Sequence, residues 1–178
     1  MSQPNSSFEA TLVDRDGAVL PDGWTLLADD ETTGADGPYV LSFDRALREL
    51  DGLNGHYGVR IKPGDDVRLL APYLDKLTLI EVSFPGFRDG RGYSTARILR
   101  EDLNYGGVIR AVGDVLRDQL FHMLRCGFNE FAVKDRDPAE AIASAARRFS
   151  TTYQGAADAA RPTWALRHPQ AAEVSSAS

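Results

Sequence analysis

Residues 77–103 read LTLIEVSFPGFRDGRGYSTARILREDL, which is an apolar run, a glycine-rich loop and an amphipathic run in that order. Residues 77–84 are rich in side chains that favour β-strands. Residues 94–103 repeat apolar side chains at helical spacing. The stretch therefore predicts a β-strand followed by an α-helix, with the loop at the carboxyl end of the strand.

The same alternation of apolar runs and helical patterns continues along the chain from Tyr57. The expected strands are 58–61, 77–84, 108–112 and 128–133, and the expected helices are 67–74, 94–103, 115–126 and 138–149. Pro72 would kink the first helix or delay its start, Gly127 would end the third, and Asp137 would cap the fourth. Four consecutive strand–helix units predict an α/β fold, either a small parallel sheet wound on both faces or a half-barrel.

A half-barrel would expose sheet edges and so predicts a homodimer, whereas an open sheet could stand alone with the N-terminal strands covering one edge.

The chain ends differ from this α/β domain, which we place at residues 56–153. Residues 1–55 form an N-terminal extension that is partly β, with a strand or hairpin around Asp16-Gly17, an acidic and mobile loop at 29–37, and a helix at 42–50. Residues 154–178 are rich in Ala, Ser, Gln and Pro and predict a flexible tail. Trp164 in that tail leaves docking onto the domain as an alternative.

Composition limits the classes of function. The 178 residues are 43% hydrophobic, enough for the core of one domain, and carry a net charge of −6, which disfavours nucleic-acid binding. The N-terminus lacks the features of a secretory signal, and no run of about 18 apolar residues exists to span a membrane. We therefore expect a cytoplasmic protein. Cys126 is the only cysteine, which excludes an internal disulfide, and its apolar surroundings favour a buried structural thiol over a nucleophile.

The candidate ligand-binding residues lie where the strands of a parallel α/β fold lead into helices. They are Arg88, Asp89, Gly90, Arg91, Gly92, Tyr93, Ser94, Arg97, Arg110, Gly113, Asp114 and Gln119. Ligands of such folds bind at the carboxyl ends of the strands, and Lys134 would share that rim. Glycines let backbone N–H groups approach an anion, and guanidinium groups grip it in a forked geometry. The alternative is a structured loop in which Asp89 pairs with Arg91 and Arg97 belongs to a solvated helix face.

Two of these residues carry a second interpretation. Arg110 falls in the middle of a short strand, where a buried charge needs a partner, and Asp114, Asp118 or Glu130 would supply one. Arg110 therefore forms a structural ion pair or contacts a ligand. Asp114 caps the following helix, alone or while Gly113 lets its loop approach the ligand.

No metal or cofactor is expected. The three histidines, His56, His122 and His168, are far apart and lack the spacing of a zinc site. Gly90-Arg-Gly92 lacks the third glycine of a dinucleotide-binding motif. The sequence therefore does not support a self-contained redox enzyme.

Three segments resemble a known family. They are FPGFRDGRGYSTAR at 84–97, RAVGDVLRDQ at 110–119 and RCGF at 125–128. They are similar to the bacterial domain-of-unknown-function family 934, over roughly residues 57–153. Members of that family are typically encoded beside sulfite reductase and other sulfate-assimilation genes, and they often carry the label of a probable oxidoreductase in sulfite reduction.

The resemblance implies an accessory protein of sulfite reduction that binds a small oxyanion, or a partner such as sulfite reductase, through the Arg/Gly-rich loop. An oxidoreductase label would require the redox centre to belong to a partner, so enzymatic activity stays open. One alternative is a small transferase or lyase acting on a charged sulfur-containing or phosphorylated metabolite, with Asp89 or Asp114 as general base. Another is a non-catalytic interaction module.

Overall fold

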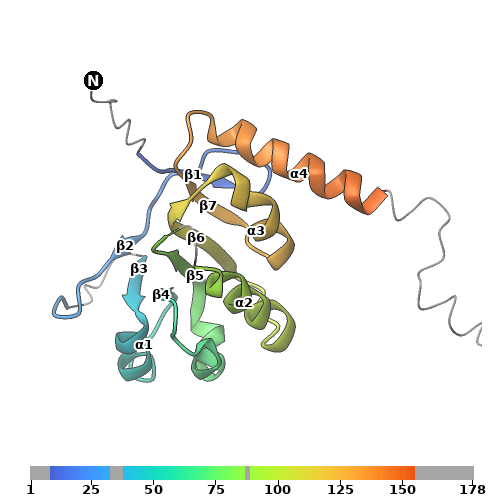
Figure 1. Ribbon diagram of the computed structural model, residues 1–178. Coiled ribbons are helices and arrows are strands. Elements are labelled where there is room, and N and C mark those ends of the chain that lie inside the picture. Colours follow the sequence, from blue (N-terminus) through green and yellow to red (C-terminus); the bar gives the residue numbers. More distant parts are fainter. Residues whose placement is uncertain (1–8, 33–37, 87–88, 155–178) are drawn as a thin grey trace, which may run out of the picture.

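The computed structural model describes residues 9–32, 38–86 and 89–154, with the side chains of 149–154 left undescribed (Figure 1). Its centre is a curled, seven-stranded sheet in the order β1-β7-β6-β5-β4-β3-β2. The strands are β1 (Thr11–Asp14), β2 (Thr25–Leu26), β3 (Tyr39–Ser42), β4 (Tyr57–Ile61), β5 (Leu77–Phe84), β6 (Val108–Val115) and β7 (Glu130–Val133). Strands β2 to β7 are parallel, and β1 pairs antiparallel with β7.

The strand order settles which of the two predicted architectures the chain adopts. From β2 to β7 each strand lies beside the next one in the sequence, without the reversal of order that defines a doubly wound sheet. The α/β prediction is confirmed, and the structure is a half-barrel. The N-terminal β extension belongs to the same sheet, because β2 and β3 continue it on one side and β1 on the other.

The helices follow the strands along the outer side of the sheet, as Figure 1 shows. They are α1 (Phe43–Glu49), η1 (Val67–Lys76), α2 (Arg91–Arg97), η2 (Ile98–Asp102), η3 (Arg117–Gln119), α3 (Leu120–Cys126) and α4 (Pro138–Gln154). Of these, η1 is a 3₁₀ helix that contains Pro72, and η2 is a π-helical turn that continues α2. In the described part of the chain, no helix combines the length and apolar character needed to cross a membrane.

Several predicted helix ends are confirmed. Ser42 caps α1 by accepting the Arg45 N–H, and Asp137 accepts the Glu140 N–H at the start of α4. Gly127 ends α3 in the left-handed conformation with φ +95°. Gly17 has φ +91° in the predicted turn, whose return segment pairs with β1 through Val13 and Val19.

Two predicted boundaries at the carboxyl ends of strands are wrong. The helix expected from Ser94 starts at Arg91, so the glycine-rich loop is shorter than predicted. Strand β6 continues to Val115 through a β-bulge, so Asp114 lies within the strand and does not cap a helix. The acidic loop at 29–37 is described only to residue 32. Of the tail predicted at 154–178, Gln154 is the last residue of α4, and residues 155–178 lie outside the described part of the chain.

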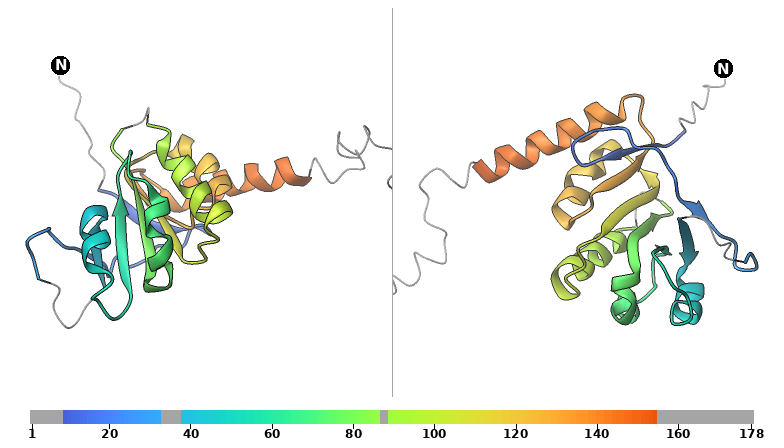
Figure 2. Two further views of the ribbon diagram at one scale, coloured as in Figure 1. Left: turned by 90° about the horizontal axis from the view of Figure 1, so that it is seen from below. Right: turned by 180° about the vertical axis from the view of Figure 1, so that it is seen from behind.

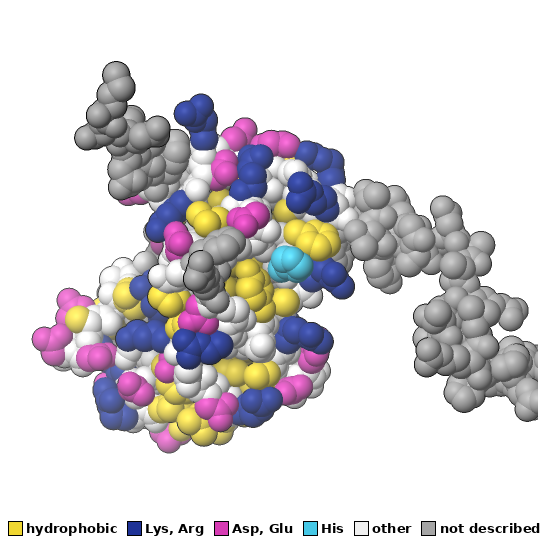
Figure 3. All heavy atoms as spheres, in the orientation of Figure 1, with side chains coloured by type: hydrophobic (Ala, Val, Ile, Leu, Met, Phe, Trp, Pro, Cys, Tyr) yellow, Lys and Arg dark blue, Asp and Glu magenta, His cyan; other side chains and the backbone are white. Residues whose placement is uncertain are grey.

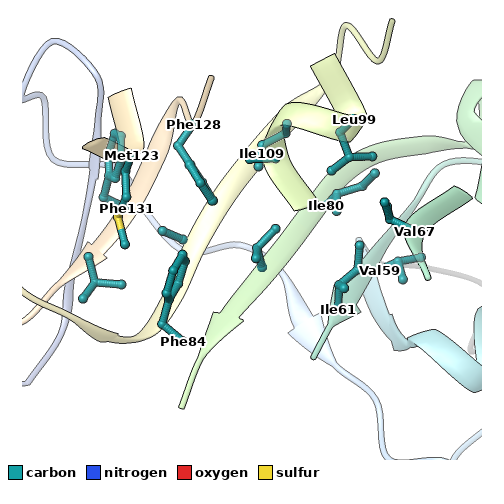
Figure 4. Packing of buried hydrophobic residues seen from close by; sticks show 14 of the residues in the cluster. Val59, Ile61, Val67, Ile80, Phe84, Leu99, Ile109, Met123, Phe128 and Phe131 are labelled. Carbon is teal, nitrogen blue, oxygen red and sulfur yellow. The ribbon is translucent and has the colours of Figure 1, made fainter. Parts of the chain in front are cut away.

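The hydrophobic core fills the space between the outer face of the sheet and the helices (Figure 4). Alternate residues of the central strands point to this face, as the period of two requires. Phe84, Ile109 and Phe131 from the strands meet Leu99 and Met123 from the helices, and each has no more than 1% of its surface exposed. These contacts fix the helices, and hence the loops at the strand ends.

The segment between β1 and β2 covers the inner face of the half-barrel, which Figure 2 shows from behind. Val40, Gly58 and Leu79 form one row on this face, since each pairs in register with the next. A Cβ atom on Gly58 would lie 3.3 Å from ring atoms of Trp24, so the indole packs directly over this row. The extension thereby buries the inner apolar side chains that a bare half-barrel would expose.

Arg100 in η2 holds the amino-terminal ends of the strands together. Its guanidinium donates to the carbonyl oxygens of Tyr105, Gly107 and Gly127 and to the side chain of Asn129. Burial lowers the pKa of Arg100, but these four acceptors keep a half-buried cation satisfied. The network stands at the end of the sheet opposite to the candidate site.

Candidate functional site

The candidate residues of the glycine-rich loop lie after β5, at the carboxyl end of the strand, as predicted. Arg88 falls outside the described residues. Asp89 accepts two side-chain hydrogen bonds from Arg91, Nε to Oδ1 at 3.0 Å and NH2 to Oδ2 at 2.7 Å, and Oδ1 also accepts the Arg91 N–H. The Arg91 side chain is 65% exposed, and one guanidinium nitrogen lies beside Gly64 in the loop after β4. Arg91 therefore presents a forked cation at the surface that is already engaged by Asp89.

This pairing also determines the acid–base behaviour of Asp89. The side-chain hydrogen bonds from Arg91, followed by the backbone hydrogen bond, hold the pKa of the Asp89 carboxyl below its ordinary value. A carboxylate stabilised in this way is a weak general base. Asp89 is thus better suited to orienting Arg91 than to removing a proton.

We expect Asp89→Asn to lower the thermal stability by no more than about 3 °C at pH 7. A carboxyl whose pKa is lowered by folding contributes stability above its unfolded pKa of about 4, and this contribution disappears as the pH falls through the lowered folded pKa. The melting temperatures of the variant and the wild type should therefore approach each other as the pH is lowered below the unfolded pKa. Thermal denaturation between pH 2 and 7 measures this, and a difference that stays constant across the range would contradict it.

The glycines of the site serve packing against Phe84. A Cβ atom on Gly92 would lie 2.5 Å from the Phe84 ring, and one on Gly113 would lie 2.5 Å from the Phe84 carbonyl oxygen. Gly90 precedes α2 and has an ordinary negative φ. We had expected these glycines to let the backbone approach a ligand. At Gly92 and Gly113 they instead let α2 and β6 pack closely against β5.

The remaining candidates on α2 lie on two faces of the helix. Tyr93 is half-buried between Phe84, at a ring-centroid distance of 5.4 Å, and His122, at 6.5 Å, and burial raises the pKa of its hydroxyl. Ser94 is exposed. Arg97 pairs with Glu101 one turn along, at 3.1 Å, and both side chains are about 60% exposed. Arg97 is thus on a solvated face, which was the alternative interpretation.

Arg110 lies away from the loop, on the inner face, in a row of alternating charges. Arg60, Glu81, Arg110 and Glu130 pair in register on β4, β5, β6 and β7. Arg60 contacts Glu81 at 2.7 Å, and Arg110 contacts Glu81 at 3.4 Å and Glu130 at 2.8 Å. The predicted partner Glu130 is confirmed, and Asp22 from the segment over the inner face adds a contact of 3.0 Å. We call these four strand residues the charge ladder.

Asp114 and Gln119 have structural contacts at the end of β6. Asp114 lies 3.7 Å from the ammonium group of Lys134, and both side chains are partly exposed. Gln119 is buried, and its side-chain oxygen accepts the Leu116 N–H at 3.0 Å. Gln119 therefore caps the turn that leads into α3, a role that we had assigned to Asp114.

A pocket of about 430 Å³ lies beside these residues, between the end of β6, the end of β7, α3 and α4. Its charged and hydroxyl-bearing lining consists of Arg117, Asp118, Lys134, Asp135, Ser144 and Arg148. Its apolar lining consists of Leu116, Phe121, Ala141 and Ala145. Arg117 donates to Asp135 at 3.1 Å, and Figure 3 shows Lys and Arg side chains interspersed with Asp and Glu side chains over the surface of the molecule. The pocket is thus a concave site beside the carboxyl ends of β6 and β7, with three cations and two carboxylates in its lining.

Sequence reasoning included Lys134 in the rim but missed Arg117 and Arg148. Arg117 lies in the GDVLRDQ segment, in which roles were predicted for Asp114 and Asp118 but not for Arg117. Arg148 and Ser144 are four residues apart on α4, a spacing that puts them on one helix face. Only the apolar residues of this helix were used to predict it. The two polar residues beside them, Ser144 and Arg148, were the signal that was missed.

Residues 58–164 match the family model described as "Bacterial protein of unknown function (DUF934)". The chain belongs to this family. No curated protein matches the DUF934 chain. Among solved structures, the crystal structure of inosine 5′-monophosphate dehydrogenase from Legionella pneumophila is similar, with 15% identity, a TM-score of 0.46, and coverage of 71% of this chain and 44% of that enzyme. The DUF934 chain spans less than half of that enzyme's length, and we carry nothing of its activity over.

The part of the DUF934 chain that matches the family model contains most of the features of the candidate site. It includes β4 to α4, and therefore the Asp89–Arg91 pair, the charge ladder and the pocket. Asp22 and Trp24, which cover the inner face, precede it. The features at the strand ends thus belong to the family region itself.

A second, polar pocket of the DUF934 chain, of about 410 Å³, is lined by Arg97, Glu101, His122, Arg125 and Cys126. Burial raises the pKa of the Cys126 thiol, although Arg97 and Arg125 partly oppose this. A thiol with a raised pKa is a poor nucleophile at neutral pH. Among the described residues, no group of three or more His, Cys, Asp or Glu side chains is placed to hold a metal ion.

Proposed function

We propose that this DUF934 protein is a cytoplasmic accessory protein of assimilatory sulfite reduction that binds a small oxyanion at the carboxyl ends of its parallel strands. The family and the GDVLRDQ and RDGRGYS motifs support the pathway, since related genes are typically found beside sulfite reductase. One observation carries the binding site: Arg117, Lys134 and Arg148 line a single pocket beside β6 and β7.

The pocket is a better anion site than the loop that first suggested one. Arg91 donates two hydrogen bonds to a single carboxylate on an exposed surface. Arg117 likewise donates to Asp135, but the pocket adds Lys134, directly after β7, and Arg148 from α4 in a concave setting. Guanidinium and ammonium groups that converge on a cavity are stronger anion ligands than isolated surface cations, because the cavity limits solvent screening. An oxyanion at Arg117 would displace the carboxylate of Asp135, which is 20% exposed and also accepts the Asp137 N–H.

The Asp89–Arg91 pair suits a protein contact. Asp89 fixes the orientation of a guanidinium group that is 65% exposed, so a partner would meet a preorganised, forked donor at low entropic cost. We assign this surface to a partner such as sulfite reductase. The transferase or lyase alternative needs a general base, and Asp89 is disfavoured in that role by its lowered pKa.

Homodimerisation stays a prediction of the half-barrel. The edge of β1 is covered by the return of the hairpin, with hydrogen bonds of 2.9 Å from Asp14 to Ala18 and from Leu20 to Leu12. The other edge is β2, which has only Thr25 and Leu26, both exposed. Short and covered edges lower the tendency to pair with another chain, so the two edges of the sheet give the predicted homodimer little support.

Titration calorimetry at low ionic strength tests the anion site. We expect the wild type to bind sulfite, sulfate or phosphate, and we expect Arg117→Gln and Lys134→Gln to weaken binding at least about fivefold, as the loss of a charged hydrogen bond requires. Arg68→Gln removes an exposed arginine that pairs with Asp102 and Asp66, and it should leave the affinity unchanged.

Arg91→Gln separates the two surfaces. It should keep the anion affinity and lose co-purification with sulfite reductase. No binding of any of the three anions by the wild type would remove the oxyanion proposal. Loss of anion binding in Arg91→Gln together with normal binding in Arg117→Gln would move the site back to the loop.

A further inference from the structure

The pocket beside β6 and β7 has an apolar wall that an inorganic anion does not need. Phe121 and Leu116 line it and are only half-buried. Four other phenylalanines in the described part of the chain, Phe43, Phe84, Phe128 and Phe131, are buried. Phe121 is therefore unusual among these described phenylalanines in leaving part of its ring open to a cavity.

The lining of the pocket combines apolar and cationic side chains. Leu116 and Phe121 come from the chain that enters and begins α3, and Ala141 and Ala145 come from α4. Arg117 and Lys134 stand where β6 and β7 lead into their helices, with 49% and 44% of their side chains exposed. Ala141 and Ala145 contribute only small side chains to the lining, and Arg117 and Lys134 remain partly exposed to solvent.

The size of the pocket also exceeds what an inorganic oxyanion would fill. Its volume of about 430 Å³ lies within the range of about 300–1,000 Å³ that is typical of sites for organic ligands. Sulfite or sulfate would contact the cations at the rim and leave Phe121 against water. A ligand with an apolar body would remove that ring from water and would gain from ring stacking.

We infer that the pocket takes an organic oxyanion, with a sulfate, sulfonate or phosphate group on Arg117 and Lys134 and an aromatic or similarly flat apolar body against Phe121. This inference rests on the proposed oxyanion site and specifies its ligand class. Contacts of the charged group with Arg117 and Lys134 orient the ligand, and contacts of the apolar body with Phe121 add affinity.

Calorimetry with matched probes tests the ligand class. Phenyl phosphate and benzenesulfonate are compared with inorganic phosphate, sulfate and neutral phenol. We expect each aryl anion to bind at least tenfold more tightly than its inorganic counterpart, and phenol to bind more weakly than either aryl anion. Phe121→Ala should reduce the affinity for the aryl anions about tenfold and leave that for the inorganic anions unchanged.

Two further variants keep each outcome decisive. Arg117→Gln should weaken both ligand classes, and Arg125→Gln, which removes the cation 5.8 Å from the Phe121 ring centroid, controls for a change in the ring's surroundings. Phe121→Leu keeps an apolar side chain if Phe121→Ala unfolds. Equal affinities for aryl and inorganic anions would overturn the inference and leave the proposed oxyanion site standing. Aryl binding that does not depend on Arg117 would overturn the inference, and inorganic-anion binding that does not depend on Arg117 would overturn the proposed oxyanion site.

Discussion

Replacing Arg110 by methionine is expected to lower the free energy of unfolding by about 3 kcal/mol, because it removes the central cation of the charge ladder. Arg110 has 4% of its side chain exposed and contacts Glu81, Glu130 and Asp22. Its loss leaves three carboxylates with fewer partners, and Glu81 is itself only 4% exposed. A buried anion that loses a partner keeps its full desolvation cost. Urea denaturation followed by circular dichroism measures the change.

Arg97→Met is the matched control for this substitution. It removes an arginine from an exposed pair with Glu101, so its effect should stay within about 0.5 kcal/mol. The double variant Arg110→Met/Glu81→Gln should be more stable than the sum of the two single changes predicts, by at least about 1 kcal/mol, because the two groups contact each other. Additive effects, or equal losses for Arg97→Met and Arg110→Met, would show that the ladder contributes no buried coupling.

The charge ladder shows which contacts of this fold the sequence could predict and which it could not. Arg110 was correctly expected to need a partner, because the middle of a parallel strand is buried whichever way the strands pair. Glu130 was among the expected partners. Glu81 and Asp22 were not, since a partner on the neighbouring strand depends on the register, and one 88 residues away depends on how the N-terminal segment crosses the sheet. Neither is encoded in a local pattern.

The N-terminal strands illustrate the same limit. The helix at 42–50 was predicted from its apolar spacing and is found as α1. Strands β2 and β3 were not predicted, because they have two and four residues and are defined by their parallel neighbours. So short a run carries little periodicity of its own. Their place in the sheet follows from strand β4, which provides the edge on which β3 forms.

At the candidate site, the sequence predicted where the Arg/Gly-rich segment lies in the fold but not which contacts its side chains make. The RDGRGY segment lies at the strand end where it was expected, but its arginine and aspartate satisfy each other. The pocket needs Arg117, Lys134 and Arg148 from three elements, so it exists only after the end of β6 and α4 are packed together. A search restricted to compact motifs favours the segment and misses the pocket.

Replacing Gly113 by alanine is expected to destabilise the protein by about 3 kcal/mol or more. Gly113 has φ +97°, and side chains of L-residues disfavour positive φ by about 1–2 kcal/mol. In addition, the new Cβ would lie 2.5 Å from the carbonyl oxygen of Phe84 and 3.1 Å from its carbonyl carbon. These are backbone atoms of the paired strand β5, so the contact cannot be relieved by a side-chain rotation. Relief requires β5 and β6 to separate at the bulge.

Two other glycines make this prediction specific. Gly106→Ala places a Cβ with nothing within 4 Å and at an unstrained φ, so its stability should change by less than about 0.5 kcal/mol. Gly92→Ala places its Cβ 2.5 Å from the Phe84 ring at an ordinary helical φ, and because a ring can shift slightly, its loss should lie between the other two. Urea denaturation of the three variants gives the order directly. If Gly113→Ala were as stable as Gly106→Ala, neither the bulge at β6 nor its contact with Phe84 would constrain the strand, and the end of β6 would be free to move relative to the pocket.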